Sequence, residues 1–419
     1  MGCSDNKKIY RIQNLDRVSQ LPDPIILSIL SRLPLEDSAR ASILSKTWKN
    51  YCRLYPVLYF DHNLFALQSL ASATEVGGGE PDFSQLREMF MDDVDHRLTS
   101  ARHLDSPIRK LALNVAFNDS TSSIAYEFPA SMLTSKHLRK ISIRGCKLGC
   151  DPISRFWLER LCLSHVVMDY DALENLTIFC QGIETLILEN CSVEMIKFLN
   201  LSKFPNLKKV VIGIQCGELD YIDIVDTNLE CITCDAQTEL CVSAAACASI
   251  KEIDCAWCTF DQPTLLKDFT STFPLLEEGC LQIHDTNTFK AANNLLRKLI
   301  LLSNDNDFAC VKEVYIDCPS LIYFDCWTKG LEELHLNCPK LREFNFAGTT
   351  VPKRVLCSSM TALEKSSWNI VMRDAYDTTW LMNLREFIVP LIGNQIANGE
   401  YPVFFRPFHF LAFIITLCS

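Results

Sequence analysis

Apolar and polar residues follow one recurring pattern through most of this chain: apolar, two polar, apolar, one variable, apolar. Clear copies are IRKLAL, LRKISI, LERLCL, IETLIL and LKKVVI, which begin at residues 108, 138, 158, 183 and 207. The last two apolar residues of each copy flank a single variable residue, as a short strand requires. Because successive copies start about 20–30 residues apart, we predict a solenoid of stacked parallel strands over residues 108–389.

Later copies continue the array: LECITC, IKEIDC, LRKLIL, VKEVYI, LEELHL and LREFIV begin at residues 229, 250, 296, 311, 331 and 384. The period fits irregular leucine-rich repeats, so the predicted fold class is an α+β or α/β solenoid with parallel strands. From 311 to 341 the units start ten residues apart, which is too short for a full coil with a helix. We therefore expect alternate units to form strands on opposite sides of one twenty-residue coil, with LDYIDI at 219 as another second-side strand.

Two local features qualify this prediction. Residues 259–295 match the pattern poorly, so they are either an insertion or degenerate repeats. Cys318 and Cys338 are each followed by proline in the ten-residue units, which places them at equivalent turns between strands.

A second pattern, at helical spacing, occupies residues 17–60. Asp23 is expected to cap a helix with Pro24 at its first position. The apolar stripe that follows has i, i+3, i+4, i+7 spacing and consists of Ile26, Ile29, Leu30 and Leu33.

A second helix after Pro34 has one apolar side formed by Leu35, Ala39, Ile43 and Leu44. Ser45 is the expected cap of a third helix, which carries Trp48 and Tyr51. Helices this short cannot bury a sufficient core alone, so the module either meets a partner or packs on the rest of the chain.

These residues resemble an F-box. The matching segments are Leu21-Pro22-Asp23, ILSRLP at 29–34 and Leu44-Ser45-Lys46-x-Trp48, in forms similar to those of plant F-box proteins with leucine-rich repeats. Thr47 stands where arginine is common in that family, and Pro24 where an acidic residue often sits. The resemblance implies docking onto the Skp-type adaptor of a cullin–RING ubiquitin ligase. The adaptor-facing or module-core positions that carry over are Leu21, Pro22, Ile29, Leu30, Leu33, Leu44 and Trp48.

Residues 61–107 are predicted to connect this module to the repeats. VGGGEP at 76–81 indicates a loop. A helix is expected after it, because apolar residues recur at helical spacing: Phe83, Leu86, Met89, Phe90, Val94 and Leu98. This helix followed by SPIRKLAL at 106–113 again resembles the entry into the repeats of the plant family. Residues 1–16 are expected to be a flexible N-terminus and 390–419 a tail whose abrupt apolar ending suggests truncation.

The composition narrows the possible partners and the compartment. The formal net charge of −11 argues against electrostatic binding to nucleic acid or to an anionic membrane. The start MGCSDNKKIYR has no apolar core of a signal peptide, and Asn6 stands where a myristoylation motif needs serine or threonine. The 21 cysteines are therefore expected to be reduced thiols in a protein of the cytoplasm or nucleus.

The cysteines raise one specific alternative. Cys231-x-x-Cys234 and Cys255-x-x-Cys258 have the spacing of a four-cysteine zinc site. In the repeat register, however, Cys234 and Cys255 occupy the third apolar position, so they should point into the core. Each pair then straddles a strand instead of lying on a tight turn. We expect no metal or other cofactor, and keep a zinc-dependent protein as the third hypothesis.

No motif for hydrolysis, phosphate binding or dinucleotide binding occurs, so we predict a non-catalytic protein. The leading hypothesis is a substrate-receptor subunit of an SCF-type ligase, whose repeats bind a target protein. The alternative is a repeat scaffold that never meets a ligase. Candidate target contacts are variable residues of the repeats: Glu184, Tyr315, Tyr323, His335 and Asn345.

Overall fold

The computed structural model describes residues 21–33, 40–41, 45–46, 48, 51, 57–67, 69, 83–103, 108–115, 126–129, 137–149, 158–180, 182–193, 198–214, 220–225, 228–235, 238–261, 264–283, 286–303, 311–349, 352–358, 362–370 and 403–405. Contacts divide the chain into two compact units. Unit 1 comprises residues 1–115 and 135–141, and unit 2 comprises residues 116–134 and 142–419.

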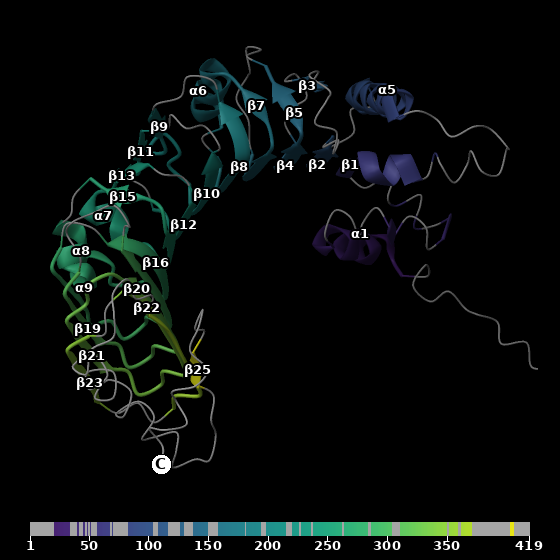
Figure 1. The fold of residues 1–419 in the computed structure, drawn as a ribbon. Coiled ribbons are helices and arrows are strands. Elements are labelled where there is room, and N and C mark those ends of the chain that lie inside the picture. Colours follow the sequence, from purple (N-terminus) through teal and green to yellow (C-terminus); the bar gives the residue numbers. More distant parts are fainter. Residues whose placement is uncertain are drawn as a thin grey trace, which may run out of the picture. The chain divides into compact units, whose positions relative to one another are not determined.

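Unit 1 begins with helix α1, Asp23–Arg32 (Figure 1). The prediction that Asp23 caps this helix was wrong by one residue, because Pro22 is the N-cap and Asp23 already belongs to the first turn. The carbonyl of Pro22 accepts the N–H of Ile25 at 2.8 Å, and Pro24 has no N–H to offer. The donors that an aspartate would cap are therefore already satisfied or absent.

The predicted apolar stripe of α1 forms the core of a small module. Ile26 and Leu30 are buried together with Ala41 and Trp48, and Ile29 and Leu33 pack against them from partly exposed positions. The side-chain oxygen of Ser45 accepts the N–H of Trp48 at 3.2 Å, which confirms Ser45 as a cap. The apolar residues expected on the second helix, namely Leu35, Ala39, Ile43 and Leu44, lie outside the described residues.

Unit 1 also contains a long helix that packs near two parallel strands. Strand β1, Val57–Asp61, pairs with β2, Lys110–Asn114. Helix α5, Phe83–His103, buries a stripe formed by Leu86, Phe90, Val94 and Leu98. Its Arg97 guanidinium lies 4.6 Å from the centre of the Phe60 ring on β1. The helix was predicted, but Met89 is exposed because it lies on the opposite side from the buried stripe.

Unit 2 is a parallel-strand solenoid with few helices, and one long sheet runs through it. Neighbouring strands of this sheet come from successive coils and pair in parallel. Strand β4, Lys140–Arg144, spans the division between the units. The strands that follow are β6 Arg160–Ser164, β8 Thr185–Val193, β10 Lys209–Ile214, β12 Cys231–Cys234, β14 Glu252–Cys255, β16 Glu278–Ile283, β18 Lys298–Ser303, β20 Tyr323–Thr328, β22 Glu343–Gly348, β24 Lys365–Ile370 and β25 Val403–Phe405.

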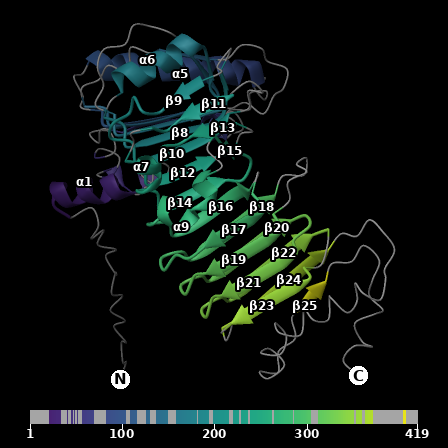
Figure 2. The same ribbon diagram turned by 90° about the vertical axis from the view of Figure 1, so that its left-hand side faces the viewer.

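Shorter sheets and helices form the other side of the coils, as the ladder of strands in Figure 2 shows. The first set of strands is β3 Tyr126–Phe128, β5 Cys146–Leu148 and β7 Val167–Met168, which continues onto the end of β8. The second set is β9 Phe198–Asn200, β11 Tyr221–Asp223, β13 Glu239–Cys241 and β15 Thr259–Phe260. The third set is β17 Thr288–Ala291, β19 Glu313–Asp317, β21 Glu333–Asn337 and β23 Arg354–Ser358. The helices are α6 Tyr170–Phe179, α7 Ala244–Cys247, α8 Thr264–Lys267 and α9 Phe269–Thr272.

The predicted alternation of ten-residue units is confirmed. The units that begin at 311 and 331 form β19 and β21, which pair with each other in the third short sheet. The units that begin at 321 and 341 form β20 and β22, which pair in the long sheet. The strand expected at 219 is β11, on the second side. One apolar pattern thus produces both faces, and the copy at 384 lies outside the described residues.

Residues 259–295 are a degenerate repeat and not an insertion. Strand β16 pairs in register with β14 on one side and β18 on the other. The pattern was hidden because Gly279 stands at the second apolar position. A Cβ at Gly279 would lie 3.2 Å from Leu276 and 3.5 Å from Leu299, so neighbouring leucines already fill that place.

The two Cys-Pro turns are equivalent, as predicted. Both thiols are buried, and each donates to a carbonyl of the preceding coil: Cys318 to Ala291 at 3.6 Å and Cys338 to Ile316 at 3.8 Å. The N–H of Leu321 and that of Leu341 close the turns by bonding to the carbonyls of these cysteines, each at 3.1 Å.

The stability of the solenoid should depend on the inward rows of the long sheet. Phe324 is fully buried, and its ring stacks on that of Phe344 at 5.5 Å. Phe324→Ala should cost about 3–5 kcal/mol through lost burial and a cavity. Hydrogen exchange of the β18–β24 amides would measure this local loss. The control is Ile322→Ala, two residues away and exposed, which should cost less than about 0.5 kcal/mol. Equal exchange rates in the two variants would contradict the assignment of the rows.

Candidate functional site

The structure separates the predicted adaptor-binding residues by burial. Leu30 and Trp48 lie in the core of the N-terminal module. Three others are partly buried against that core: Leu21, Ile29 and Leu33. Pro22 is exposed, and Leu44 lies outside the described residues. Leu30 and Trp48 therefore hold the module together, and any partner would meet the partly exposed members.

Sequence reasoning missed Ile25 on this module. Its side chain is 48% exposed, although it lies beside the buried Ile26 in an uninterrupted apolar run. The helical spacing placed Ile26 in the core stripe, whereas Ile25 lies outside that stripe and was not considered. Together with the exposed Pro22, Ile25 offers an apolar surface at the start of α1.

A hydrogen bond ties the start of α1 to the segment after Ser45. The Tyr51 hydroxyl donates to the carboxylate of Asp23. That bond raises the pKa of Tyr51 above its ordinary value, because the tyrosinate would have to form beside a carboxylate. The acidic residue that the sequence suggested as a cap instead connects two segments of the module.

Glu184 belongs to a charged row at the edge of the long sheet. The N–H of each member bonds to the carbonyl of the member one coil before, at 2.7–2.9 Å. In chain order the row reads Glu184, Lys208, Glu230, Lys251, Glu277 and Arg297. Ion pairs link Glu184 to Lys208 at 3.4 Å, Glu230 to Lys251 at 2.6 Å and Glu277 to Arg297 at 3.0 Å. Alternating signs one coil apart favour the correct register, so Glu184 has a structural partner.

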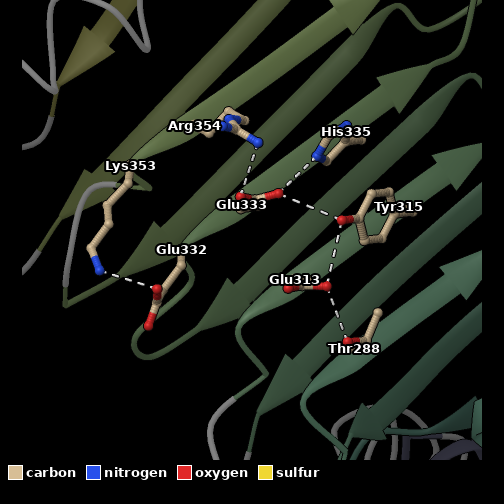
Figure 3. Close-up of polar contacts among 8 residues, drawn as sticks. All are labelled: Thr288, Glu313, Tyr315, Glu332, Glu333, His335, Lys353 and Arg354. Atoms are coloured by element: carbon tan, nitrogen blue, oxygen red, sulfur yellow. Dashed lines mark hydrogen bonds and ion pairs between the residues drawn. The ribbon is translucent and has the colours of Figure 1, made fainter.

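Tyr315 and His335 lie on the third short sheet, in the polar network that Figure 3 shows. Their rings stack at 4.3 Å. The Tyr315 hydroxyl lies 3.4 Å from Glu313 and 3.5 Å from Glu333, and its single hydrogen is shared between these two carboxylates. His335 Nε2 is 3.2 Å from Glu333, and Thr288 donates to Glu313 at 3.2 Å. Burial and the two carboxylates raise the pKa of Tyr315, so its hydroxyl stays a donor.

Basic residues complete this network. The Arg354 guanidinium lies 3.3 Å from Glu333, on the oxygen that His335 and Tyr315 do not use. Lys353 approaches Glu332 at 3.1 Å (Figure 3). Lys312 approaches the same carboxylate at 3.8 Å. Glu332 and Glu333 are thus neutralised within the chain, whereas the partners of Glu313 are the neutral hydroxyls of Thr288 and Tyr315. The network suits a rigid surface more than proton-transfer chemistry, because each acceptor already has a fixed donor.

Tyr323 and Asn345 lie on the long sheet, on the other side of the coil. Asn345 donates to the Tyr323 hydroxyl at 3.1 Å, and that hydroxyl donates to Asp325 at 3.2 Å. Asp325 was not among the predicted contacts, and neither was Trp327, which is 52% exposed. Both stand at outward positions of β20, so the alternation of that strand could have identified them.

The five predicted target contacts therefore lie in three places. Glu184 is in the edge row, Tyr315 and His335 are on the third short sheet, and Tyr323 and Asn345 are on the long sheet. They do not form one site. The same apolar pattern occurs in strands on both sides of the coil, so equivalent positions of the pattern lie on different faces. Whether any of them contacts a target remains a prediction.

Comparison with known proteins matches the N-terminal module and the repeat solenoid to two different domain models. The F-box domain model matches residues 18–59. The model described as At1g61320/AtMIF1, LRR domain, matches residues 85–345, which is more than half of the chain. The chain belongs to the F-box/LRR family. F-box/LRR proteins are generally non-catalytic adaptors, and neither matched domain indicates an enzyme.

Three relatives of this F-box/LRR protein are proteins of Arabidopsis thaliana. F-box/FBD/LRR-repeat protein At3g52680 is 26% identical over 222 residues, which cover 51% of this chain and 48% of the relative. F-box/FBD/LRR-repeat protein At4g00160 is 25% identical over 227 residues, 51% of this chain and 49% of the relative. Putative F-box/LRR-repeat protein At3g58880 is 39% identical over 99 residues, 24% of this chain and 20% of the relative. The chain thus spans about half the length, or less, of these curated relatives.

Three of the four paired cysteines are core residues of the solenoid. Cys234 and Cys255 are buried at the ends of β12 and β14, and Cys258 is buried in the turn that follows β14. Cys231 points elsewhere, because its thiol donates to Glu252 at 3.3 Å. Within the described ranges, no group of three or more His, Cys, Asp or Glu side chains is arranged to hold a metal. Among the described helices, none combines the length and apolar character that a bilayer crossing requires.

Burial of the thiols predicts a pattern of chemical reactivity. Burial raises the pKa of Cys326 and of Cys338 to about 12. The folded chain should therefore keep both thiols unalkylated by iodoacetamide at pH 8, because about one thiol in ten thousand is ionised there. Peptide mass spectrometry would show labelling of both after unfolding in urea. Partly exposed Cys241 is the internal control and should react in the folded state.

The same labelling experiment tests whether Cys234 and Cys255 bind zinc. Adding a chelator should leave the labelling of Cys234 and Cys255 unchanged, because their protection comes from packing in the core. New labelling of both cysteines with chelator, without loss of secondary structure, would contradict the packing explanation and favour a bound metal.

Proposed function

We propose that this F-box/LRR protein is the substrate receptor of an SCF-type cullin–RING ubiquitin ligase. In this proposal the F-box binds a Skp-type adaptor, and the repeat domain binds a target protein for ubiquitination. The observation that carries the proposal is the combination of an F-box module, which has its own core and an apolar surface at α1, with a repeat solenoid in one chain.

Such a receptor works by positioning. It needs no catalytic group of its own, because the ligase subunits carry the ubiquitin-charged enzyme. Holding a target beside that enzyme turns an encounter between separate molecules into one within a single complex. The gain is an effective concentration, which for short linkers is on the order of millimolar.

The surface at the start of α1 supports adaptor binding. The module buries Leu30 and Trp48 within itself, yet leaves Ile25 about half exposed. Burying an exposed isoleucine against a partner contributes about 1–2 kcal/mol. Pro22 and the partly exposed Ile29 and Leu33 extend the apolar area available to an adaptor.

We also propose that the protein acts in the cytoplasm or nucleus, without nucleic acid or membrane as a partner. Cys255, Cys318 and Cys326 are free thiols buried in the solenoid, as a reducing compartment permits. The net charge of −11 disfavours polyanionic partners.

Adaptor binding can be tested on the exposed surface instead of the core. Ile25→Lys should weaken binding of the full chain to a purified Skp-type adaptor by about tenfold or more, because a charge would replace an apolar contact. Its unfolding midpoint should not change, since Ile25 is 48% exposed. Isothermal titration calorimetry and thermal unfolding measure the two effects.

The matched control is Met89→Lys, the same kind of substitution at an exposed position of α5, which should leave the affinity unchanged. Trp48→Ala should lose binding and module stability together. If the unmodified chain does not bind the adaptor, the ligase function is wrong, and a scaffold that is independent of the ligase becomes the better description. If only Ile25→Lys binds normally, the assigned surface is wrong.

A further inference from the structure

The two outward faces of the solenoid differ in how their carboxylates are neutralised. On the third short sheet, Glu332 and Glu333 each have basic partners within 4 Å. On the long sheet, Asp325 has none: no Lys, Arg or His nitrogen among the described residues lies within 4 Å of its carboxylate. This difference singles out the surroundings of Asp325.

The position of Asp325 follows from the alternation of β20. Phe324, Cys326 and Thr328 point into the core and are buried. Asp325 points outward between Tyr323 and Trp327, and its neighbours on the adjacent strands are Ile300 and Asn345. We call Ile300, Leu302, Tyr323, Asp325, Trp327 and Asn345 the Asp325 patch, since Leu302 pairs with Trp327 in the same register.

Asp325 is unusually enclosed for an outward residue. Its side chain is only 9% exposed, because larger residues flank it on four sides. One carboxylate oxygen accepts the Tyr323 hydroxyl at 3.2 Å, and the other is buried and forms no hydrogen bond of normal geometry with the described residues. Burial raises the pKa of Asp325 above its ordinary range, although the nearby donors of Trp327, Tyr323 and the Cys326 backbone oppose the shift. A desolvated carboxylate without a basic partner favours a cationic hydrogen-bond donor.

Acidic residues outnumber basic ones among the outward charges near Asp325. The outward carboxylates of strands β14 to β22 also include Glu252, Asp254, Glu278 and Glu343. Opposing them on these strands is Lys298, whose ammonium lies 5.9 Å from the centre of the Tyr323 ring. Lys365 on β24 pairs in register with Glu343 and not with Asp325. The local excess of acidic residues on β14 to β22 therefore favours a cation beside Asp325.

The rest of the patch is apolar and aromatic. Ile300 and Leu302 are half-buried on β18, and Trp327 is 52% exposed beside them. An exposed indole offers a face to a guanidinium or ammonium group. Access of a cation to the enclosed oxygen of Asp325 requires Trp327 to change rotamer, which exposed side chains do in picoseconds to nanoseconds.

We infer that the Asp325 patch binds a segment of the target protein that places an arginine or lysine next to an apolar side chain. The cation pairs with Asp325 and lies against Trp327, while the apolar neighbour covers Ile300 and Leu302. This inference rests on the proposed function, because it specifies which face and which chemistry the receptor would use. Glu333 of the third short sheet, which is already paired with Arg354, serves as the comparison.

A peptide selection on the full chain tests this without adaptor or ligase. A displayed library of random decapeptides would be enriched on the immobilised chain and on two variants. Asp325→Asn keeps the shape and an acceptor for Tyr323 but removes the charge, and Trp327→Ala removes the aromatic face. The matched control is Glu333→Gln, which removes a carboxylate from the opposite face.

The expected result is enrichment of peptides with arginine or lysine beside an apolar residue. A selected peptide should bind at least about tenfold more weakly to Asp325→Asn and to Trp327→Ala, and equally well to Glu333→Gln. Replacing its basic residue with glutamine should cause a similar loss. Asp325→Asn should not lower the unfolding midpoint, because it removes a desolvated charge.

Three outcomes would overturn the inference: no enriched peptide, enrichment without a basic residue, or equal binding to Asp325→Asn. These outcomes differ from failure of the proposed function, which appears as loss of adaptor binding. A chain that selects basic peptides but binds no adaptor would retain this surface and lose the ligase role.

Discussion

The backbone hydrogen bonds between successive coils are the constraint on which the solenoid depends. Each strand of the long sheet pairs with strands of the coils before and after it, so its outward and inward positions are fixed by its neighbours. A slip of one residue in any strand would put an apolar row into solvent and a polar row into the core. Buried residues such as Phe324 and Phe344 therefore follow one another from coil to coil.

The same register arranges the surface into rows. The members of the charged row from Glu184 to Arg297 are one coil apart, so each acidic residue lies next to a basic one. Stacking of Tyr315 on His335, and of Lys290 over Tyr315 at 5.2 Å, also joins residues paired across neighbouring strands. In such rows the opposite charges pair with one another, which stabilises that face of the solenoid. The row that contains Asp325 leaves a charge to be neutralised by another molecule, which is why we assign recognition to it.

The F-box module obeys a different rule, because its core is made by helix faces. Ile25 and Ile26 are chemically identical neighbours, but α1 turns one inward and leaves the other exposed. Leu30 and Trp48 stabilise the module from inside, so their substitution changes the fold before it changes a contact. Exposed residues such as Ile25 are the better probes of a partner.

The sequence by itself determined the F-box, the repeat array and the two-sided ten-residue units, because helical and strand periods are local properties of the chain. It also placed Cys234 and Cys255 in the core, since both occupy the third apolar position of a repeat. Only the tertiary structure decided which outward carboxylates have basic partners: Asp325 is enclosed without one, while Glu333 is paired with Arg354. Those facts depend on which residues neighbouring coils bring together, and pairing between coils about twenty residues apart is not encoded in any one repeat.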